Sequence, residues 1–382
     1  MIDDIINIIK SCLPANYKQL HIHEPSFEKK DADKVKKCIE STFVSTKGKY
    51  IDSFTKRLVK ITGCKNILLT SSGTSALFLS LKTIDVNCCE VLVPSMTFVA
   101  TANSVVDACG IPNFIDSSEK SLNICPIKLE KYLKEIAIYK NKVCINKVTG
   151  RIIKALIVVH AYGEPADMTT ITNLTKKYNI QIVEDSAGAL GSYAHGKHVG
   201  LRSRFSIFSF NGNKIITTGM GGAILFKNKN DYESIKHLIG TARISHDWKV
   251  EHDRSGYNLR MANINAALGD GQIMRIKNTL KNKNILYKKY KNAFHDNEYC
   301  FLHEYNDMTQ PNHWITNLYL KNKYKRYHQI LIEALHKENI MVRELWKPQH
   351  MNKMYRNMPR SSIVNAIKHW RTGISLPSSY YK

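Results

Sequence analysis

Residues 151–186 read RIIKALIVVHAYGEPADMTTITNLTKKYNIQIVEDS. The stretch opens with an apolar run rich in Ile and Val, continues through the more polar segment 167–179, and closes with a second apolar run, 180–185. Short β-branched apolar runs predict buried strands, and a polar segment with apolar residues three and four positions apart predicts a helix. A strand, a helix and a strand in this order favour a parallel pair of strands.

The same alternation continues on both sides of this stretch. Further strands are predicted at 66–70, 90–95, 111–116, 203–210 and 221–226, and helices at 31–43, 50–63, 71–84 and 97–110. The helix 50–63 ends at a glycine, which suits a helix C-terminus. Alternating strands and helices predict an α/β fold with a mostly parallel central sheet.

The pattern changes toward the C-terminus. A long helical stretch begins near residue 258, and beyond about residue 292 come a strand (313–320), a helix (326–339) and a strand (340–345). This order predicts a smaller α+β domain. We therefore expect an N-terminal segment and a large domain over residues 1–280, and a small C-terminal domain over residues 281–382.

The composition indicates a soluble globular protein. Of the 382 residues, 43% are hydrophobic and 23% are charged. No apolar run approaches the ~18 residues that a membrane span needs, and the start, MIDDIINIIK, carries acids where a secretion signal needs positive charge. The nine cysteines are odd in number and show no Cys-x-x-Cys spacing, so we expect free thiols in a reducing compartment. These features predict a cytoplasmic protein without a membrane partner.

The formal net charge of +24 raises nucleic acids and anionic small molecules as partners. The basic residues are dispersed, many of them along solvated helices such as 276–292, and no zinc-finger, RNP or helix-turn-helix motif is evident. We therefore expect an anionic substrate and no nucleic acid, with a basic regulatory protein lacking enzymatic activity as an alternative. His21 and His23 alternate as two metal ligands on a strand would, but no third ligand is evident, so no metal site is predicted.

Lys214 stands alone between two apolar segments. Residues 207–226 read IFSFNGNKIITTGMGGAILF, in which an apolar run ends in Asn-Gly-Asn and the lysine is followed by Ile-Ile and a glycine-rich turn. One interpretation is a hairpin tip with an exposed lysine, because Asn-Gly favours tight turns. The other interpretation is a buried lysine with a chemical role.

Two further segments favour the chemical role. TSSGTSAL (70–77) follows a strand and opens a helix, so its hydroxyls and free N–H groups offer a seat for phosphate, although an ordinary N-cap has the same pattern. Asp185 ends the strand 180–185, where open α/β sheets bind ligands. A lysine for the aldehyde, an acid for the pyridine nitrogen and a phosphate seat are what pyridoxal 5'-phosphate (PLP) requires.

Eight motifs in order resemble the DegT/DnrJ/StrS family of sugar-nucleotide aminotransferases, which are PLP enzymes of fold type I. The resemblance runs from about residue 20 to the C-terminus, and it implies the large domain of an aspartate aminotransferase-like PLP-dependent transferase with a smaller C-terminal domain. The motifs are STFVSTKGKYIDSF (41–54), TSSGTSAL (70–77), VLVPSMTFVATANSV (91–105), VVHAYGEPADM (158–168), VEDSAGALGS (183–192), SFNGNKIITTGMGGAIL (209–225), GYNLRMANINAALG (256–269) and ISLPSS (374–379).

The resemblance implies roles for individual residues around the cofactor ring. Lys214 matches the lysine that binds the cofactor covalently and then moves a proton between cofactor and substrate carbons. Asp185 matches the acid that pairs with the pyridine nitrogen, and Phe98 matches the aromatic side chain that stacks on the ring.

The resemblance also implies a set of phosphate contacts. Gly73, Thr74 and Ser209 match phosphate binders within one subunit. Asn258 matches a residue that the neighbouring subunit contributes to the phosphate, and this match implies a homodimer with shared active sites.

The reaction implied by the family is transfer of an amino group from L-glutamate to a nucleotide-linked keto sugar. HIHEPSF (21–27) and LWKPQHMNKMY (345–355) resemble enzymes that aminate C4 of UDP-linked 2-acetamido-4-keto-6-deoxy sugars, as in the bacillosamine and legionaminic acid routes. GDP- and dTDP-linked keto sugars stay open as alternatives. Trp346, Lys347 and His350 match the substrate pocket or, alternatively, a packed turn between domains. His160 either lines the pocket or is a core histidine.

The chain departs from the family at two positions. Gly188 stands where family members have Gln, His or Glu near the ring oxygen of the cofactor, so that contact is expected to be missing or replaced. Met220 interrupts a run that is often all glycine, and its side chain could narrow the turn after Lys214. Two related activities are alternatives. The dehydratase branch of the family has a histidine in place of the lysine, so Lys214 speaks against that activity here. A PLP enzyme acting on amino acids alone would need an arginine clamp, for which Arg343 and Arg371 could serve.

Overall fold

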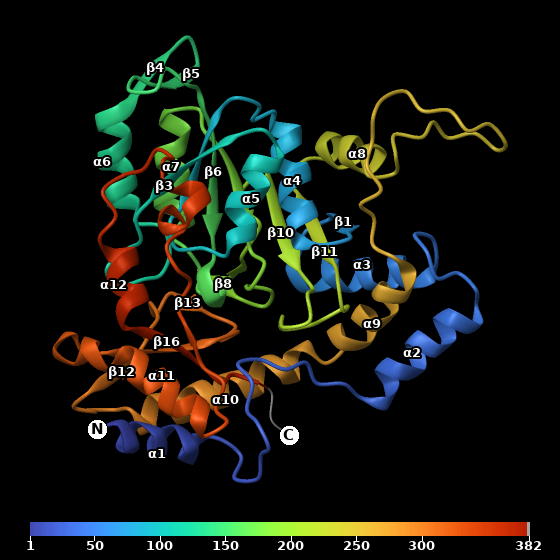
Figure 1. Ribbon diagram of the computed structural model, residues 1–382. Coiled ribbons are helices and arrows are strands. Elements are labelled where there is room, and N and C mark those ends of the chain that lie inside the picture. The colour runs from blue at the N-terminus through green and yellow to red at the C-terminus, as the bar shows by residue number, and fades with distance from the viewer. Residues whose placement is uncertain (380–382) are drawn as a thin grey trace.

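The computed structural model describes residues 1–379. Its centre is a seven-stranded sheet made, in chain order, of β1 (Asn66–Thr70), β2 (Glu90–Pro94), β3 (Ile111–Ile115), β6 (Ile153–Val159), β7 (Gln181–Asp185), β10 (Phe205–Ser209) and β11 (Gly222–Phe226). The spatial order is β1-β11-β10-β7-β6-β2-β3 (Figure 1). All pairs from β10 to β3 are parallel, whereas β11 is antiparallel to both neighbours. The prediction of a mostly parallel α/β sheet is confirmed.

Helices cover both faces of this sheet, because successive side chains of a strand point to opposite sides. In β6, Ala155 and Ile157 belong to one apolar cluster, and Leu156 and Val158 belong to another. The first cluster includes side chains of α3 (Lys49–Thr62), α4 (Gly73–Ile84) and α5 (Val99–Asp107), and the second includes those of α6 (Pro126–Ile136) and α7 (Met168–Lys177).

The ends of these helices carry the capping residues that their sequences offer. α3 ends at Gly63, whose backbone is left-handed at φ 77°, as the sequence predicts. α4 begins after Ser72, whose hydroxyl accepts a hydrogen bond from the Ser75 N–H at 3.0 Å. α7 begins after Asp167, which accepts from the Thr170 N–H at 3.1 Å.

A second core lies beside the large sheet. Its four-stranded sheet runs in the order β12 (Cys300–Leu302), β14 (Thr316–Leu320), β16 (Gly373–Leu376) and β15 (Arg343–Glu344), with α11 (His328–Lys337) and α12 (Asn365–Thr372) beside it. α1 (Ile2–Cys12) buries its isoleucines in this core and contacts α11, so the N-terminus lies beside the C-terminal part of the chain (Figure 1). The domain boundary at residue 280 stays a prediction.

The predicted long helical stretch is two helices, α9 (Asn263–Ile273) and α10 (Ile276–Ala293). The Arg275 guanidinium at the break donates to the Asp31 carboxylate at 2.6 and 2.9 Å, and Asp31 belongs to α2 (Lys29–Glu40). This ion pair holds α2 against the break, while α9 packs on α2 and α3 and α10 continues into the second core.

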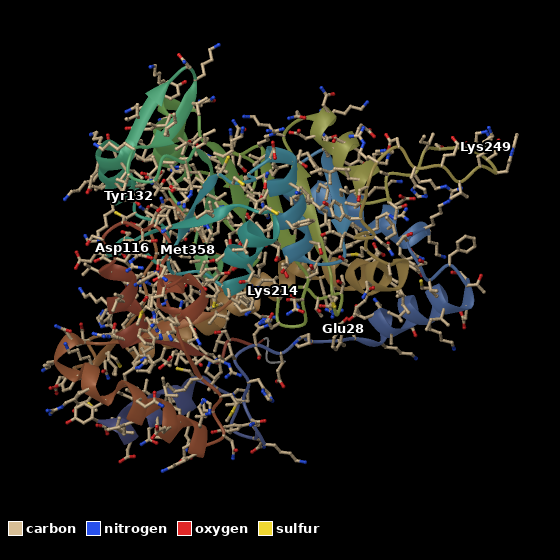
Figure 2. All side chains as sticks on the ribbon, turned by 45° about the horizontal axis from the view of Figure 1, so that its top comes forward. Glu28, Asp116, Tyr132, Lys214, Lys249 and Met358 are labelled. Carbon is tan, nitrogen blue, oxygen red and sulfur yellow. The ribbon has the colours of Figure 1, made fainter. Side chains whose placement is uncertain are left out.

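Several elements were not predicted, because short strands of two to four residues carry little periodic signal. They are the hairpin β4 (Ala137–Lys140) and β5 (Val143–Asn146), the small sheet of β8 (Tyr193–Ala194), β9 (Lys197–His198) and β13 (Thr309–Gln310), and the strands β12 and β16. The helices α1, α6, α8 (Lys229–Leu238) and α12 were not predicted either. After α8, the segment 241–257 projects from the body of the protein, with Lys249 near its outer end (Figure 2).

Asp116 joins the large sheet to the C-terminal helix α12. It follows β3 and is fully buried, and its carboxylate accepts hydrogen bonds from the N–H groups of Val364, Asn365 and Ala366 at 2.9–3.0 Å and from the Lys128 ammonium. Burial acts to raise the pKa of Asp116, but these donors outweigh it and hold the pKa below its usual value.

We expect Asp116→Asn to lower the free energy of unfolding by about 1–3 kcal/mol, because charge-assisted bonds to the start of α12 are lost. Urea unfolding at pH 7 measures the difference. A depressed folded-state pKa means that the carboxylate stabilises the fold above its unfolded pKa, and that this contribution disappears as the pH falls through the folded pKa. The gap between the two proteins should therefore shrink at acid pH. Asp3→Asn, on the exposed start of α1, is the matched control; equal effects of the two substitutions would contradict the prediction.

Candidate active site

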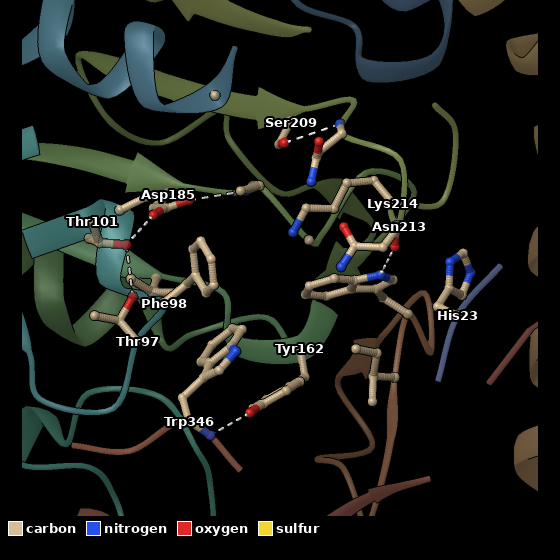
Figure 3. A pocket seen from close by; sticks show the side chains of 18 of the residues that line it. His23, Thr97, Phe98, Thr101, Tyr162, Asp185, Ser209, Asn213, Lys214 and Trp346 are labelled. Carbon is tan, nitrogen blue, oxygen red and sulfur yellow. Dashed lines mark hydrogen bonds between the residues drawn. The ribbon is translucent and has the colours of Figure 1, made fainter. Parts of the chain in front are cut away.

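A cavity of about 860 Å³ lies at the edge of the large sheet where the parallel strands end and the loops after them begin. Segments after β1, β2, β6, β7 and β10 form one side of it. The other side comes from β15 and from Trp314 and Ile315, which lead into β14 (Figure 3).

Lys214 lies in the loop that joins the antiparallel strands β10 and β11. The hairpin interpretation is therefore right about the pairing of strands, but the lysine is half-buried and faces the cavity. Its Nζ atom lies 3.7 Å from the centroid of the Trp314 ring. Burial lowers the pKa of Lys214 to about 8, against the opposing effect of the Asp185 charge. Near neutral pH more of this amine is neutral and nucleophilic than for an exposed lysine.

Asp185 ends β7 and lines the cavity (Figure 3). Its carboxylate accepts hydrogen bonds from the Thr101 hydroxyl at 2.8 Å and from the Ala187 N–H at 3.1 Å. Burial raises the pKa of Asp185, while these donors and the Lys214 charge act to lower it. An acid held in this way can pair with a cationic or N–H group of a ligand.

The start of α4 forms a tight seat beside the end of β10. Ser72 serves as the N-cap, as the ordinary interpretation of this segment requires, whereas Gly73 and Thr74 line the cavity. A Cβ atom on Gly73 would lie 2.9 Å from the Ser209 Cβ, so only glycine allows this approach. The helix N-terminus and the hydroxyls of Thr74 and Ser209 are well suited to a phosphate group.

Phe98 provides an aromatic side chain next to these polar groups. It precedes α5, is 58% exposed, and lies in the cavity between Asp185 and Trp346 (Figure 3). A flat ring placed beside Phe98 can reach the carboxylate of Asp185 and the amine of Lys214. The amine, the acid, the aromatic face and the anion seat therefore fit PLP, the cofactor that the family resemblance implies.

The structure brings together most of the residues that the sequence predicts for the site. The following line the cavity: Gly73, Thr74, Phe98, His160, Asp185, Ser209, Lys214 and Trp346. Asn258 is exposed outside it, next to the projecting segment, and Lys347 is also exposed. The His350 Nδ1 atom instead lies 2.7 Å from the Ser95 hydroxyl.

His160 is buried, and both of its ring nitrogens have protein partners. Nδ1 accepts from the Ala166 N–H at 3.0 Å, so Nε2 carries the proton toward Glu184 Oε2 at 3.1 Å. This arrangement favours the interpretation of a core histidine whose ring forms part of the cavity wall.

Four of the cavity residues to which the sequence analysis gave no role in the pocket are Thr101, Tyr162, Trp314 and His23, the last considered there only as a metal ligand. The Tyr162 ring stacks on Trp346 with centroids 4.0 Å apart, and its hydroxyl accepts from the Trp346 N–H at 2.8 Å. Burial lowers the pKa of His23 well below its usual value. Thr101, one turn after Thr97 and hydrogen-bonded to it, is the only one of the four with a helical spacing signal in the sequence.

Within residues 1–379, no group of three or more His, Cys, Asp or Glu side chains is arranged to hold a metal ion. None of the helices in the same range is long and apolar enough to cross a membrane. All nine cysteines are free thiols, as predicted.

Comparison with known proteins identifies the relatives of this chain. The family model for DegT/DnrJ/EryC1/StrS aminotransferases matches residues 25–380. GDP-perosamine synthase of Escherichia coli O157:H7 is 31% identical over 94% of this chain and 93% of its own length. UDP-4-amino-4,6-dideoxy-N-acetyl-beta-L-altrosamine transaminase of Campylobacter jejuni is 30% identical over 92% and 90%. The structure of Helicobacter pylori PseC, an aminotransferase involved in pseudaminic acid biosynthesis, superposes with a TM-score of 0.86 over 94% of both chains at 26% identity.

We expect the Lys214 amine of the cofactor-free protein to titrate near pH 8, because burial disfavours its charged form. An amine-modifying reagent followed by peptide mass spectrometry gives the rate of labelling at Lys214 as a function of pH. The rate should reach half its maximum near pH 8, and the labelling profile of the exposed Lys140 in the same sample serves as the comparison. A Lys214 profile that coincides with that of Lys140 would show the amine to be solvated like any surface lysine.

Proposed function

The chain belongs to the DegT/DnrJ/EryC1/StrS aminotransferase family, and on this premise we propose that it transfers an amino group from L-glutamate to the keto carbon of a nucleotide-linked 4-keto-6-deoxy sugar. Its cofactor is PLP. The observation that carries the proposal is a single cavity lined by Lys214, Asp185 and the start of α4. The product would be an amino sugar for surface glycans.

Each part of the cofactor has a matching group in the cavity. When bound, PLP stores the amino group of the donor and withdraws electrons from the carbon that loses a proton. In our proposal Asp185 pairs with the ring nitrogen, Phe98 covers a face of the ring, and the start of α4 with Ser209 binds the phosphate. Lys214 holds the cofactor covalently between turnovers.

Lys214 also has the properties of a proton carrier. With PLP bound, the free Nζ of Lys214 would accept a proton from one carbon and return it to another. A pKa of about 8 suits both steps, because neither the neutral nor the charged form is strongly disfavoured at physiological pH. Asp185 and Lys214 thus have separate roles in one cavity: Asp185 provides a fixed negative charge, and Lys214 moves a proton.

We propose a UDP-linked 2-acetamido-4-keto-6-deoxy sugar as acceptor. The stacked rings of Tyr162 and Trp346 provide a wall for the sugar, and Arg343 and Lys347 place positive charge near the cavity mouth for the diphosphate. His350 would affect the pocket only through its contact with Ser95. His160 would contribute only as part of the cavity wall. The relatives named for UDP- and GDP-linked sugars are about equally similar, so GDP- and dTDP-linked sugars are the alternatives to assay.

We further propose a homodimer with shared active sites. Phe98 and Met220 line the cavity yet are 58% and 62% exposed, so the cavity is open on their side. Apolar side chains are also exposed on α2 and on the projecting segment, including Ile39 at 55% and Trp248 at 77%. A second copy packed over these surfaces would close the cavity and bring its Asn258 to the phosphate seat. Free thiols favour a cytoplasmic location.

We expect Lys214→Ala to abolish transamination and Asp185→Asn to slow it by at least about 100-fold, because one removes the proton carrier and the other a preorganised charge. The measurement is the visible absorption of the protein with PLP before and after L-glutamate, followed by assays with UDP-, GDP- and dTDP-linked keto sugars. In the wild-type protein a violet band should form with PLP and move to shorter wavelength with glutamate.

Lys140→Ala at the tip of β4 and Asp3→Asn on α1 are the matched controls, and both should behave as wild type. Turnover retained by Lys214→Ala would overturn its assignment. A band that forms but does not respond to glutamate would overturn the proposed donor while leaving the cofactor in place.

Mixing Lys214→Ala with Asn258→Ala tests the shared site when activity is assayed at a PLP concentration that fills wild-type sites but leaves the Asn258→Ala sites largely without cofactor. Asn258→Ala should weaken cofactor binding by roughly ten-fold, since one polar contact to the phosphate is lost. Refolding it together with Lys214→Ala gives hybrid dimers with one intact site, so activity should return to about a quarter of wild type. Activity that stays at the level of the separate variants would show that Asn258 does not reach the partner's site.

A further inference from the structure

We propose that Trp314 is the positioning residue for Lys214 and that its indole face holds the free amine of the lysine in place. In this proposal position 188 is a glycine because the indole fills the space that a side chain would need there. The inference rests on the proposed role of Lys214 and adds a residue that neither the motifs nor the family resemblance identify. The observations behind it are the contacts of Trp314 with Lys214, Asn213, Gly188, Asn312 and Lys283.

The indole contacts the lysine and the loop that carries it. Lys214 Nζ lies 3.7 Å from the ring centroid, over the face of the indole. The indole Nε1–H donates to the carbonyl oxygen of Asn213, the preceding residue, at 2.7 Å. One side chain therefore fixes both the backbone next to Lys214 and the end of its side chain (Figure 3).

Gly188 lies against the edge of the same indole. A Cβ atom at this position would lie 2.7 Å from Trp314 Cζ3 and closer still to Cε3. Such a distance is well below van der Waals contact, so even alanine would push the indole away from the lysine. The backbone φ of Gly188 is not in the left-handed region, so it is the contact with the indole that requires glycine here.

The backbone of Trp314 is held independently of the loop. Asn312 accepts from the Trp314 N–H at 2.9 Å through its side-chain oxygen, and its amide group donates to the Gly188 carbonyl at 2.9 Å. The buried side-chain nitrogen of Lys283, whose pKa is lowered well below its usual value by burial, donates to the Trp314 carbonyl at 2.9 Å and also to the carbonyl of Ser378. Trp314 and Gly188 are thus tied to each other and to the C-terminal segment, so the indole cannot drift when the lysine moves.

The electrostatics of this contact favour the charged lysine. A cation over an indole face gains more when both are shielded from water. The titratable groups that face Lys214 are Asp185 from β7, which favours the ammonium, and His23 from the N-terminal segment, whose burial disfavours its own charged form. The indole therefore offsets part of the desolvation of Lys214 and gives the protonated amine a defined resting place.

The test compares Trp314→Leu, which removes the aromatic face, with Trp314→Phe, which keeps a face but loses the Nε1 hydrogen bond. The readout is the pH profile of Lys214 labelling in the cofactor-free protein. Trp314→Leu should lower the pKa of Lys214 by about one unit, the equivalent of a shielded cation–π contact, and Trp314→Phe should recover most of that shift. Trp370→Phe, whose indole lies outside the cavity and donates to Glu344, is the control and should change nothing.

Gly188→Ala tests the second half of the proposal. It should lower the pKa of Lys214 as Trp314→Leu does, and the double variant Gly188→Ala/Trp314→Leu should show no further shift, because the indole that the methyl group displaces is already gone. Circular dichroism and urea unfolding establish that each variant is folded before it is labelled.

The proposal is overturned if Trp314→Leu and Trp314→Phe give the wild-type profile, or if the shifts from Gly188→Ala and Trp314→Leu add. Its failure is separable from that of the proposed function. A wild-type protein that forms the violet band through Lys214 and responds to glutamate supports the function, whichever profile the Trp314 variants give.

Discussion

Parallel pairing of β10, β7, β6, β2 and β3 is the constraint from which the site follows. Parallel strands that are joined through helices end at the same edge of the sheet, so the residues after each strand meet there although they are far apart in the chain. Asp185, Ser209 and the segment leading to Phe98 reach one cavity for this reason. The antiparallel strand β11 completes the arrangement, because it returns the chain through the loop that carries Lys214.

The cavity combines groups whose ionisation is shifted in opposite senses by the same cause. Burial favours the uncharged forms, so it lowers the pKa of Lys214 and raises that of Asp185. Their mutual attraction limits both shifts, and the donors Thr101 and Ala187 further limit that of Asp185. The result is an amine poised between its two forms and a carboxylate held in position, which is what a proton carrier and a fixed countercharge need.

The two cores are connected through buried polar groups, the Asp116 carboxylate and the Lys283 side-chain nitrogen, that have hydrogen-bond partners. Asp116 of the large unit receives the N–H groups at the start of α12, and Lys283 of α10 donates to backbone carbonyls that include Trp314 and Ser378. A buried charge is tolerated when hydrogen bonds satisfy it, and its directional contacts then specify a single geometry. Through these contacts the second core contributes a fixed wall to a cavity whose chemistry lies mainly in the large unit.

The sequence alone determined the alternation of strands and helices, the mostly parallel sheet, and the membership of Lys214, Asp185, Phe98 and the start of α4 in one site. The strands, helices and sheet follow from local signals such as apolar periodicity and helix capping, whereas the shared site, Phe98 above all, follows from the resemblance of contiguous motifs to the family. The sequence favoured a buried Lys214 over an exposed hairpin tip without showing what surrounds the lysine, and it left open whether His160 is a pocket or a core residue. Those questions depend on neighbours that are distant in sequence, such as Trp314 and Glu184.

Only the tertiary structure decided how Gly188 is used. In the sequence, Gly188 only lacks the side chain that family members have at this position. Nothing in its flanking residues connects it to Trp314, which lies more than a hundred positions away. In the fold, Asn312 ties the two together and the indole fills the space beside the glycine. The pKa of Lys214 was equally undetermined, because desolvation depends on what surrounds a group in three dimensions and has no counterpart in a linear pattern.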